Sequence, residues 1–258
     1  MKTISRVILV LIIPLLYNCK NEPKYDGYII KGNISNKDRG TILLSFKDLK
    51  TGKERIIDSA TIINGKFQLK NKIEHPDLVT LTLDKKKVDF FIENSEITID
   101  INPSESPYFL NAKIKGSTLQ DTYDEFNKQL DNIANDQKYK SLNDISKKYN
   151  TAGQNGNTKL QEELYKKLKD YKDLISERAQ RDKDLRLNYI NDNPNSPISP
   201  LIVKNIFSDR SPISELESIL SIFKGDAKET ITYKYFKQKY NIRKRTCLLY
   251  TSPSPRDA

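Results

Sequence analysis

Side chains able to carry redox or nucleophilic chemistry are scarce in this sequence. The chain of 258 residues contains two cysteines, Cys19 and Cys247, and one histidine, His75. Thiol-disulfide exchange normally needs two closely spaced cysteines, as in C-x-x-C, because one thiolate attacks and its neighbour resolves the mixed disulfide. A zinc site needs several cysteine, histidine or carboxylate ligands that converge. The sequence therefore predicts no catalytic residue, no metal site, no cofactor and no internal disulfide.

Acidic residues gather at two places, and a structural role explains both. The three carboxylates between Asp121 and Glu125 fall where a helix is expected to begin, and negative charge there interacts favourably with the positive end of the helix dipole. Glu93 and Glu96 flank a turn and are expected to pair across a hairpin with the lysines of residues 85–87. A glycosidase would need two carboxylates facing each other across a cleft, which nothing in the sequence predicts.

Neither nucleotide nor nucleic-acid binding is indicated. The sequence contains neither G-x-G-x-x-G nor G-x-x-x-x-G-K-[ST], the two glycine-rich patterns that cradle phosphates. The formal net charge is +10, but basic and acidic residues are interleaved along the chain, which is typical of a solvated surface. His75, beside Pro76, is expected to be a loop or strand-entry residue rather than a general base. We therefore expect no nucleic-acid partner.

The first 18 residues have the pattern of an export signal. Lys2 and Arg6 precede an uninterrupted apolar run over residues 7–16, which is about half the roughly 20 residues that a membrane-spanning helix needs. Pro14 lies inside this run. We expect residues 1–18 to be removed as a signal peptide.

The residues around Cys19 indicate that export is coupled to attachment of a lipid. Leu16-Tyr17-Asn18-Cys19 resembles the lipobox of a bacterial lipoprotein, in which the cysteine thiol receives diacylglycerol before cleavage. Tyr17 and Asn18 are larger than the small residues that usually precede this cysteine, so a plain signal peptide with an incidental cysteine is the alternative. No A-x-A-like site lies nearby, which favours the lipobox. We expect a lipidated Cys19 and then a tether, together covering residues 19–24.

A lipid on Cys19 would hold the mature chain to a bilayer of a Gram-negative envelope. No later apolar run approaches spanning length, and the mean hydropathy is -0.66. The net charge falls to +8 once Lys2 and Arg6 are removed with the signal, which suits a surface facing anionic lipid or polysaccharide. Lys20, rather than aspartate, comes directly after Cys19. Resemblance to other Gram-negative lipoproteins then favours the outer membrane, on its periplasmic or its surface face.

The composition changes abruptly after Thr246. The last twelve residues read CLLYTSPSPRDA, a stretch rich in serine and proline that does not continue the preceding helical pattern. The stretch resembles translated sequencing-adapter read-through, so residues 247–258 are expected to be an artefactual tail. On that interpretation the natural protein continues beyond Thr246, and Cys247 has no function.

Residues 25–116 are expected to form an antiparallel β domain, either a sandwich or a small barrel. Phe67 and Leu69 alternate with polar residues, as do the isoleucines from Ile97 to Ile101, so each set would share one face. Asn64-Gly65 is a strong hairpin signal because both turn positions need a positive φ. Eight runs have the length and the β-branched or aromatic content of strands: YIIKGNIS, TILLSF, ERIIDSATII, KFQLK, LVTLTLD, VDFFIE, EITIDI and NAKIKG.

Residues 117–246 are expected to be helical, because the apolar period changes there from two to about 3.6. A first helix begins near Thr118, with Ser117 or Thr118 as its cap. A long second helix is expected from Thr158 to about Ile190, between the polar stretch TAGQNGNT and Asn193-Pro194. Shorter helices are expected near residues 200–207, 212–223 and 228–240. The fold class expected for the chain is therefore α+β, with the β domain preceding a helical region.

Five segments occur in an order and spacing that resemble a known family: YIIKGNIS, IDSATIINGKFQLKN, IEHPDLVTLTLD, ENSEITIDI and KIKGSTLQDTYDEF. They resemble the N-terminal domain of unknown function of envelope lipoproteins that carry a C-terminal TlpA/ResA-type thioredoxin-like domain. YINDNPNSPISPLIV, with its core at Asn193–Ser196, resembles a stretch of the helical linker in such proteins. The resemblance covers Tyr25–Tyr240 and is densest before Phe126.

The resemblance implies that redox chemistry belongs to a subsequent thioredoxin-like domain, which would reduce or shuffle disulfides in exported proteins. The domains of this chain would then serve as anchor, spacer and recognition surface for exported protein clients. No position here matches the C-x-x-C motif, so no catalytic residue carries over, and the chain as it stands is not expected to be an enzyme. The alternative is a stand-alone lipoprotein that binds a glycan or a protein through its β domain. A hydrolase ranks third, because no catalytic constellation is visible.

Overall fold

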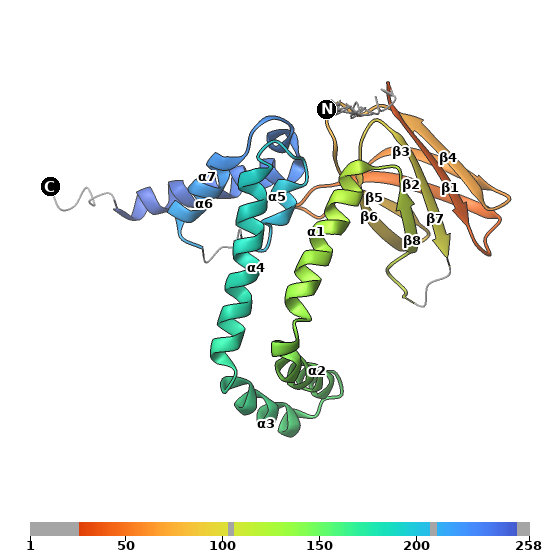
Figure 1. Ribbon diagram of the computed structural model, residues 1–258. Helices are drawn as coiled ribbons and strands as arrows, with labels where there is room; N and C mark the ends of the chain where they lie inside the picture. The colour runs from red at the N-terminus through yellow and green to blue at the C-terminus, as the bar shows by residue number, and fades with distance from the viewer. Residues whose placement is uncertain (1–25, 103–105, 207–210, 252–258) are drawn as a thin grey trace, which may run out of the picture.

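The computed structural model describes residues 26–102, 106–206 and 211–251, with side chains as far as Thr246. Eight β-strands come first and seven α-helices follow within these ranges. Figure 1 shows the strands gathered into one rounded body and the helices beside it. The expected α+β fold is therefore confirmed. The predicted signal peptide, Cys19 and the last seven residues lie outside the described part of the chain.

All eight predicted strands are present, and they form one sheet. The order across the sheet is β6-β5-β2-β3-β4-β1-β7-β8. Every neighbouring pair is antiparallel except β1 with β7, which are parallel because β7 enters beside β1 after the chain has crossed the domain. The strands are β1 (Tyr28–Ile34), β2 (Arg39–Lys47), β3 (Glu54–Ile63), β4 (Lys66–Asn71), β5 (Asp77–Leu83), β6 (Lys86–Ile92), β7 (Glu96–Asn102) and β8 (Asn111–Lys115).

Alternating side chains from all parts of this sheet meet in one apolar core. Phe67 and Leu69 are buried, as are the isoleucines of β7, and these positions were predicted from the period of two. The turn between β3 and β4 is formed by Asn64 and Gly65 at φ angles of 51° and 73°, as the predicted two-residue hairpin requires. The ring of Phe67 passes over Gly32 on β1, where a Cβ atom would lie 2.0 Å from the ring.

The sheet is nearly closed, and it divides into two four-stranded halves that meet at two seams. One half is β6-β5-β2-β3 and the other is β4-β1-β7-β8. At the first seam the ladder between β3 and β4 contains one residue pair, Ile63 with Lys66. Beyond that pair the two strands separate. The arrangement therefore combines features of the sandwich and the small barrel that the sequence predicts.

The second seam, between β6 and β8, is sealed by backbone bonds and by a helix. The Lys87 N–H donates to the Tyr108 carbonyl over 2.9 Å, and the Leu110 N–H donates to the Lys87 carbonyl over 2.9 Å. Farther along β6, the Phe91 N–H donates to the buried Gln120 Oε1 of α1 over 3.0 Å. The free edge of β6 is thus occupied, and the β3–β4 seam remains open.

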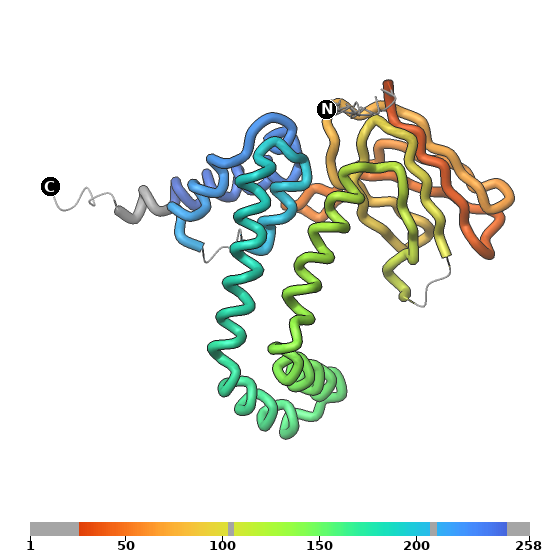
Figure 2. The backbone as a smooth tube through the Cα atoms, viewed as in Figure 1, coloured from red at the N-terminus to blue at the C-terminus, as the bar shows by residue number. Residues whose placement is uncertain are grey.

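The helices form two parts beside the sheet. Residues 118–192 form an extended arm, and residues 199–251 form a second small body at the end of the arm's last helix (Figure 1). Helix α1 leads away from β6, and α4 returns alongside it, with α2 and α3 at the far end (Figures 1 and 2). The helices are α1 (Thr118–Ala134), α2 (Lys140–Gln154), α3 (Thr158–Lys169), α4 (Lys172–Asp192), α5 (Ser199–Ile202), α6 (Ile213–Ile222) and α7 (Ile231–Thr251), with short 3-10 helices η1 (Gln137–Tyr139) and η2 (Gly225–Glu229).

Some helix boundaries agree with the sequence prediction and some do not. Ser117 caps α1, accepting the Gln120 N–H over 3.1 Å. Helix α4 ends at Asp192, with Asn193 as its C-cap, where Asn193-Pro194 was expected to end a helix. The single long helix expected from Thr158 to Ile190 is wrong. The chain breaks between α3 and α4, because the apolar stripe of α3 packs on α2 and the chain must then turn to return along α1.

The C-terminal helix is longer than its pattern suggests. Helix α7 runs to Thr251, past the expected end at Tyr240 and past the change of composition at residue 247. No helix among the described residues is both long and apolar enough to cross a bilayer.

A second apolar core joins the helices to the sheet. Phe91 of β6 is fully buried in it together with Phe126 of α1 and residues of α4 to α7. The Phe91 ring meets Tyr123 edge-on at a centroid distance of 5.3 Å, and the Phe126 ring meets Tyr189 at 5.0 Å. Aromatic pairs in this geometry add to the stabilisation that burial provides. The helical region is therefore packed onto the β domain.

Candidate binding cleft at the open seam

The candidate site is a cleft of about 520 Å³ at the wide end of the open β3–β4 seam. The ends of β1 to β5 form its walls, and the end of η2 and the first turn of α7 close one side. The cleft therefore lies where the β domain meets the helical region. Aromatic, charged and apolar side chains share its lining, among them Tyr28, Phe46, Arg55, His75, Asp77 and Ile231.

A buried tyrosine forms the floor of the cleft. The Tyr28 hydroxyl donates to Asp58 Oδ2 over 2.8 Å, which links β1 to β3 across the region where β3 and β4 separate. The other carboxylate oxygen of Asp58 accepts the Ser59 N–H over 2.8 Å. Burial, and secondly the adjacent carboxylate, raise the pKa of Tyr28 well above its ordinary value. This phenol is therefore a fixed hydrogen-bond donor at neutral pH and not an acid or a base.

A second carboxylate holds the helical region against the sheet. Asp77, at the start of β5, accepts the Ile231 N–H over 2.7 Å and so caps the beginning of α7. Its other oxygen accepts the Leu78 N–H over 2.7 Å. Burial raises the pKa of Asp77 despite these bonds. The residue serves the joint between the two regions, since both of its oxygens are already occupied.

Most of the charged side chains around the cleft are paired. Lys72 contacts Asp26 over 2.5 Å, Lys234 contacts Glu229 over 3.0 Å, and His75 Nδ1 lies 3.2 Å from Asp226 Oδ1. These pairs are exposed, so each contributes little to stability.

Arg55 is the exception among these charged side chains. Its guanidinium lies 5.4 Å from the centre of the Phe46 ring, and it forms no ion pair within the described residues. An arginine held over an aromatic ring keeps its donors available for a carboxylate or a phosphate.

The described lining contains no cysteine or serine nucleophile beside a base, and no cluster of three potential metal ligands occurs in the described part of the chain. His75, as predicted, lies in the loop before β5, where its partner is Asp226. The cleft offers a ligand an apolar wall, a guanidinium and the backbone of a separated strand pair.

A comparison with known families identifies the β domain. Its two seams, the β-domain walls of the cleft and the cap of α1 all lie within one matched segment. Residues 28–123 are a DUF4369 domain, a domain of unknown function. The match includes every strand and the beginning of α1. No curated protein and no solved structure matches the chain.

The carboxylates singled out from the sequence of the DUF4369 domain are dispersed. Glu93 and Glu96 do not pair with residues 85–87, and this prediction is wrong. Glu93 accepts the Leu119 N–H over 3.2 Å at the start of α1, and Glu96 pairs with Lys31 over 2.6 Å. Residues 85–87 lie at the start of β6, whereas Glu93 and Glu96 come after its last residue, Ile92, so the length of the strand separates them.

The carboxylates at the start of α1 are structural, as expected. Asp121 lies in the first turn, where its charge favours the helix dipole. Asp124 accepts from the Gln120 side chain over 2.8 Å, and Glu125 pairs with Lys128 over 3.2 Å. Cys19, the predicted lipidation site, lies outside the described residues, and its role stays a prediction.

The cleft residues were not predicted as a site from the sequence. Tyr28, Phe46 and Arg55 are single residues in three strands. Phe46 and Arg55 are cross-strand partners on β2 and β3, and Tyr28 of β1 joins them at the opening where β3 and β4 separate. A usable signal is Asp58, a carboxylate in the middle of a strand that is otherwise rich in β-branched residues. Such a residue needs a partner when it is partly buried, and Tyr28 is that partner.

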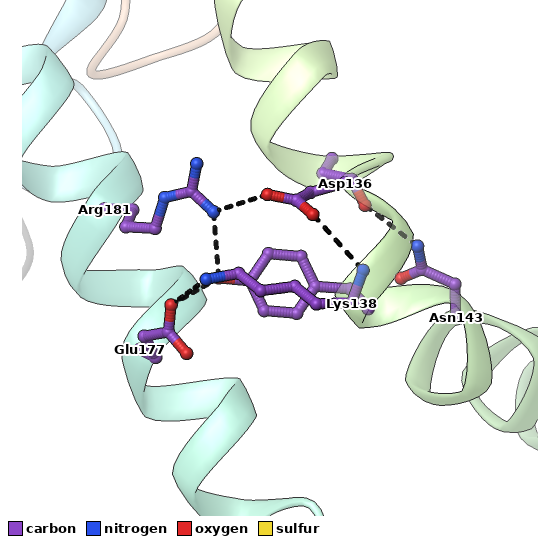
Figure 3. Close-up of polar contacts among 7 residues, drawn as sticks. Asp136, Lys138, Asn143, Glu177 and Arg181 are labelled. Carbon is purple, nitrogen blue, oxygen red and sulfur yellow. Dashed lines mark hydrogen bonds and ion pairs between the residues drawn. The ribbon is translucent and has the colours of Figure 1, made fainter.

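A cluster of charged residues in the arm is a second candidate site, but its acidic and basic side chains already pair with each other. Figure 3 shows Arg181 of α4 reaching Asp136 across the arm, and Glu177 of α4 meeting Lys138 of η1. The Arg181–Asp136 distance is 2.9 Å. Both acids surround Tyr139, which is fully buried and receives a bond from Arg181 over 3.4 Å. We interpret this cluster as the fastening between the two sides of the arm.

Proposed function

We propose that this chain is a lipid-anchored envelope lipoprotein and the N-terminal accessory module of a thiol-disulfide oxidoreductase. Its anchor is diacylglycerol on Cys19, in the outer membrane, and its DUF4369 domain is the surface that meets exported protein clients. The redox chemistry belongs to a thioredoxin-like domain with C-x-x-C. The observation that carries the proposal is the DUF4369 match at residues 28–123, which begins a short distance after the lipobox-like residues 16–19.

The geometry of the cleft agrees with an accessory role. Its phenol and its most buried carboxylate are both engaged in structural hydrogen bonds, which leaves Arg55 and the separated strands to contact a ligand. A module of this kind would bring a client close to a redox centre without taking part in the chemistry. Such a contribution acts through effective concentration.

Lipidation is tested by expressing the full chain in a Gram-negative host fed an alkyne-bearing fatty acid. The chain should be labelled and should fractionate with outer membranes. The variant Cys19→Ser should lose both properties, whereas the matched control Cys247→Ser should keep both. Labelling that persists in Cys19→Ser, or that disappears in Cys247→Ser, contradicts the proposed anchor.

The redox association is tested by sequencing genomic DNA across the codon for Thr246. An open frame that runs into a thioredoxin-like sequence with C-x-x-C supports it. A stop codon near that position would overturn it and would favour a stand-alone binding lipoprotein.

A stand-alone binding lipoprotein is the second candidate, and one feature of the surface favours it. Tyr108 and Phe109, in the loop before β8, are 70% and 68% exposed. Adjacent exposed aromatic rings suit stacking on a sugar or docking of an apolar protein surface. The variant Tyr108→Ala/Phe109→Ala should lose retention on immobilised envelope polysaccharide if the ligand is a glycan. Equal retention of the variant and the parent chain would contradict this alternative.

A further inference from the structure

The separated edge of β3 presents backbone groups that no strand of the described chain pairs. Ile63 pairs with Lys66 beside the two-residue turn, so the peptide groups of Ile63 face β4. Residues two apart in a strand direct their backbone groups to the same side. The backbone groups of Ser59 and Thr61 therefore face the open seam, and both residues are exposed.

The strand across the seam presents a matching edge. On β4 the same alternation directs the backbone groups of Gln68 and Lys70 toward β3, and these residues are exposed as well. An unpaired strand edge is a template for another chain, and native proteins usually cover or blunt such edges. Here the β6–β8 seam is covered by the loop before β8 and by α1. On the β3 side of the other seam, the Ser59 N–H is bound by the Asp58 carboxylate.

The charges along this seam indicate the partner's side chains. Lys66 and Lys70 lie on β4, and within the described residues neither takes part in an ion pair. Arg55 lies at the wide end, with its guanidinium over the Phe46 ring. Both carboxylates of β3 already have partners, Asp58 in the Tyr28 hydroxyl and Glu54 in Lys87. Lys66 and Lys70 therefore make the β4 side of the seam basic. At the wide end Arg55 adds a cation, and Glu74 and Glu229 also line the cleft there.

We propose that the β3–β4 seam binds an extended polypeptide segment that carries an acidic side chain. The segment pairs with the backbone N–H and carbonyl of Thr61 and with the carbonyl of Ser59, whose N–H is already bound by Asp58. Its carboxylate meets Arg55 in the cleft. This mode of recognition is strand addition, in which main-chain bonds provide affinity and alternate side chains provide specificity. This inference rests on the proposed function in one respect: the segment is taken to come from an exported protein client.

The decisive experiment uses one synthetic peptide and its N-methylated forms. The peptide has nine residues, alternates threonine and valine, and ends in glutamate. Two further versions carry N-methyl groups on the odd or on the even amides. Because only alternate amides point toward the paired strand, one set should weaken binding at least tenfold and the other less than twofold. Fluorescence anisotropy of labelled peptide with the full chain in detergent measures the dissociation constants.

Variants and hydrogen exchange locate the site. Arg55→Glu should weaken binding at least tenfold, while the matched control Lys113→Glu, on β8 away from the seam, should stay within twofold. Bound peptide should slow exchange in segments 57–62 and 67–70 and leave segment 86–92 unchanged. The unmutated chain supplies the exchange data, so this test does not depend on the folding of a variant.

Several outcomes would overturn the proposal. They are equal weakening by both N-methylated sets, protection at β6 in place of β3, indifference to Arg55→Glu, and the absence of binding at millimolar peptide. None of these results alters the labelling of Cys19 or the reading frame beyond Thr246. Failure of the strand-addition site is therefore distinguishable from failure of the proposed function.

Discussion

At the scale of single residues, Asp77 shows how one buried carboxylate joins two regions. It accepts the first N–H of α7 from a strand 154 positions away in sequence, a role that a helix usually gives to its own preceding residue. Removing its charge and removing its oxygen are separable changes. Asp77→Asn keeps an acceptor for the Ile231 N–H, whereas Asp77→Ala leaves that N–H buried without a partner.

We predict that Asp77→Ala lowers the free energy of unfolding by about 1 to 2 kcal/mol, while Asp77→Asn changes it by less than about 0.5 kcal/mol at pH 7. The pKa of Asp77 is raised in the folded chain. Its protonation therefore stabilises the folded state fully at pH values below the ordinary pKa of aspartate, and this stabilisation is lost as pH rises through the raised pKa of the folded state. Wild type should therefore lose stability relative to Asp77→Asn between pH 4 and pH 7. Urea unfolding at both values measures this, and equal effects of the two variants would contradict it.

Tyr28 gives a second prediction at this scale. Tyr28→Phe removes the hydroxyl that reaches Asp58 and should lower the free energy of unfolding by about 1 kcal/mol, the net value of a hydrogen bond. Tyr108→Phe, at an exposed position, is the matched control and should have no effect. Chemical unfolding followed by circular dichroism compares them. A Tyr28→Phe chain as stable as the control would show that this bond does not hold the floor of the cleft.

At the scale of elements, the packing of β1 on β4 depends on one glycine. A Cβ atom at Gly32 would lie 2.0 Å from the Phe67 ring, so the ring or the strand would have to move. Gly32→Ala should cost about 1 to 3 kcal/mol, as overpacked cores do. The double variant Gly32→Ala/Phe67→Leu should recover part of that loss because a smaller side chain makes room. Thermal unfolding of the single and double variants measures this, and a double variant less stable than the sum of its singles would contradict it.

The arm gives a prediction about pH. Arg181 lowers the pKa of Asp136, and Lys138 lowers that of Glu177, in both cases chiefly by a side-chain hydrogen bond. Their stabilising contribution is therefore present at neutral pH and is lost as pH falls through the lowered values, below about 4. Amide hydrogen exchange in α2 and α3 should be faster at pH 3 than at pH 6, after correction for the effect of pH on the intrinsic exchange rate. The variant Asp136→Asn should show this faster exchange already at pH 6, and Asp144→Asn, on exposed α2, should not.

How far the elements could be predicted depended on whether a local signal exists. The eight strands and the Asn64–Gly65 turn are predictable from alternation and from the need for positive φ, which are properties of neighbouring residues. The break between α3 and α4 is not, because the stripe from Leu160 to Leu168 is equally compatible with one long helix. Only packing on α2 decides it. The same holds for the seam: that β3 and β4 separate beyond Ile63 is set by how two half-sheets wrap a shared core, which no residue of either strand encodes alone.

At the scale of the whole molecule, the β domain and the helical region share a core at their joint. Phe91 belongs to β6 but is buried among helices, and its N–H is bound by Gln120 of α1. Asp77 and the Tyr123–Phe91 contact lie at the same joint. The two regions should therefore unfold together in the intact chain, because residues of both build this second core.

Phe91→Ala tests this coupling. Loss of a buried phenylalanine creates a cavity and costs about 3 to 5 kcal/mol, and at this position the cost falls on the joint. We expect the parent chain to unfold in one transition and the Phe91→Ala chain to unfold in two. In the variant, the helical circular dichroism signal at about 222 nm should be lost first, while the amides of the sheet still exchange slowly. Phe90→Ala, whose side chain is buried in the core of the sheet, is the matched control and should lower the stability of both regions in a single transition. If both variants unfold in a single transition, Phe91 is not the residue that couples the two regions, and the other contacts at the joint hold them together.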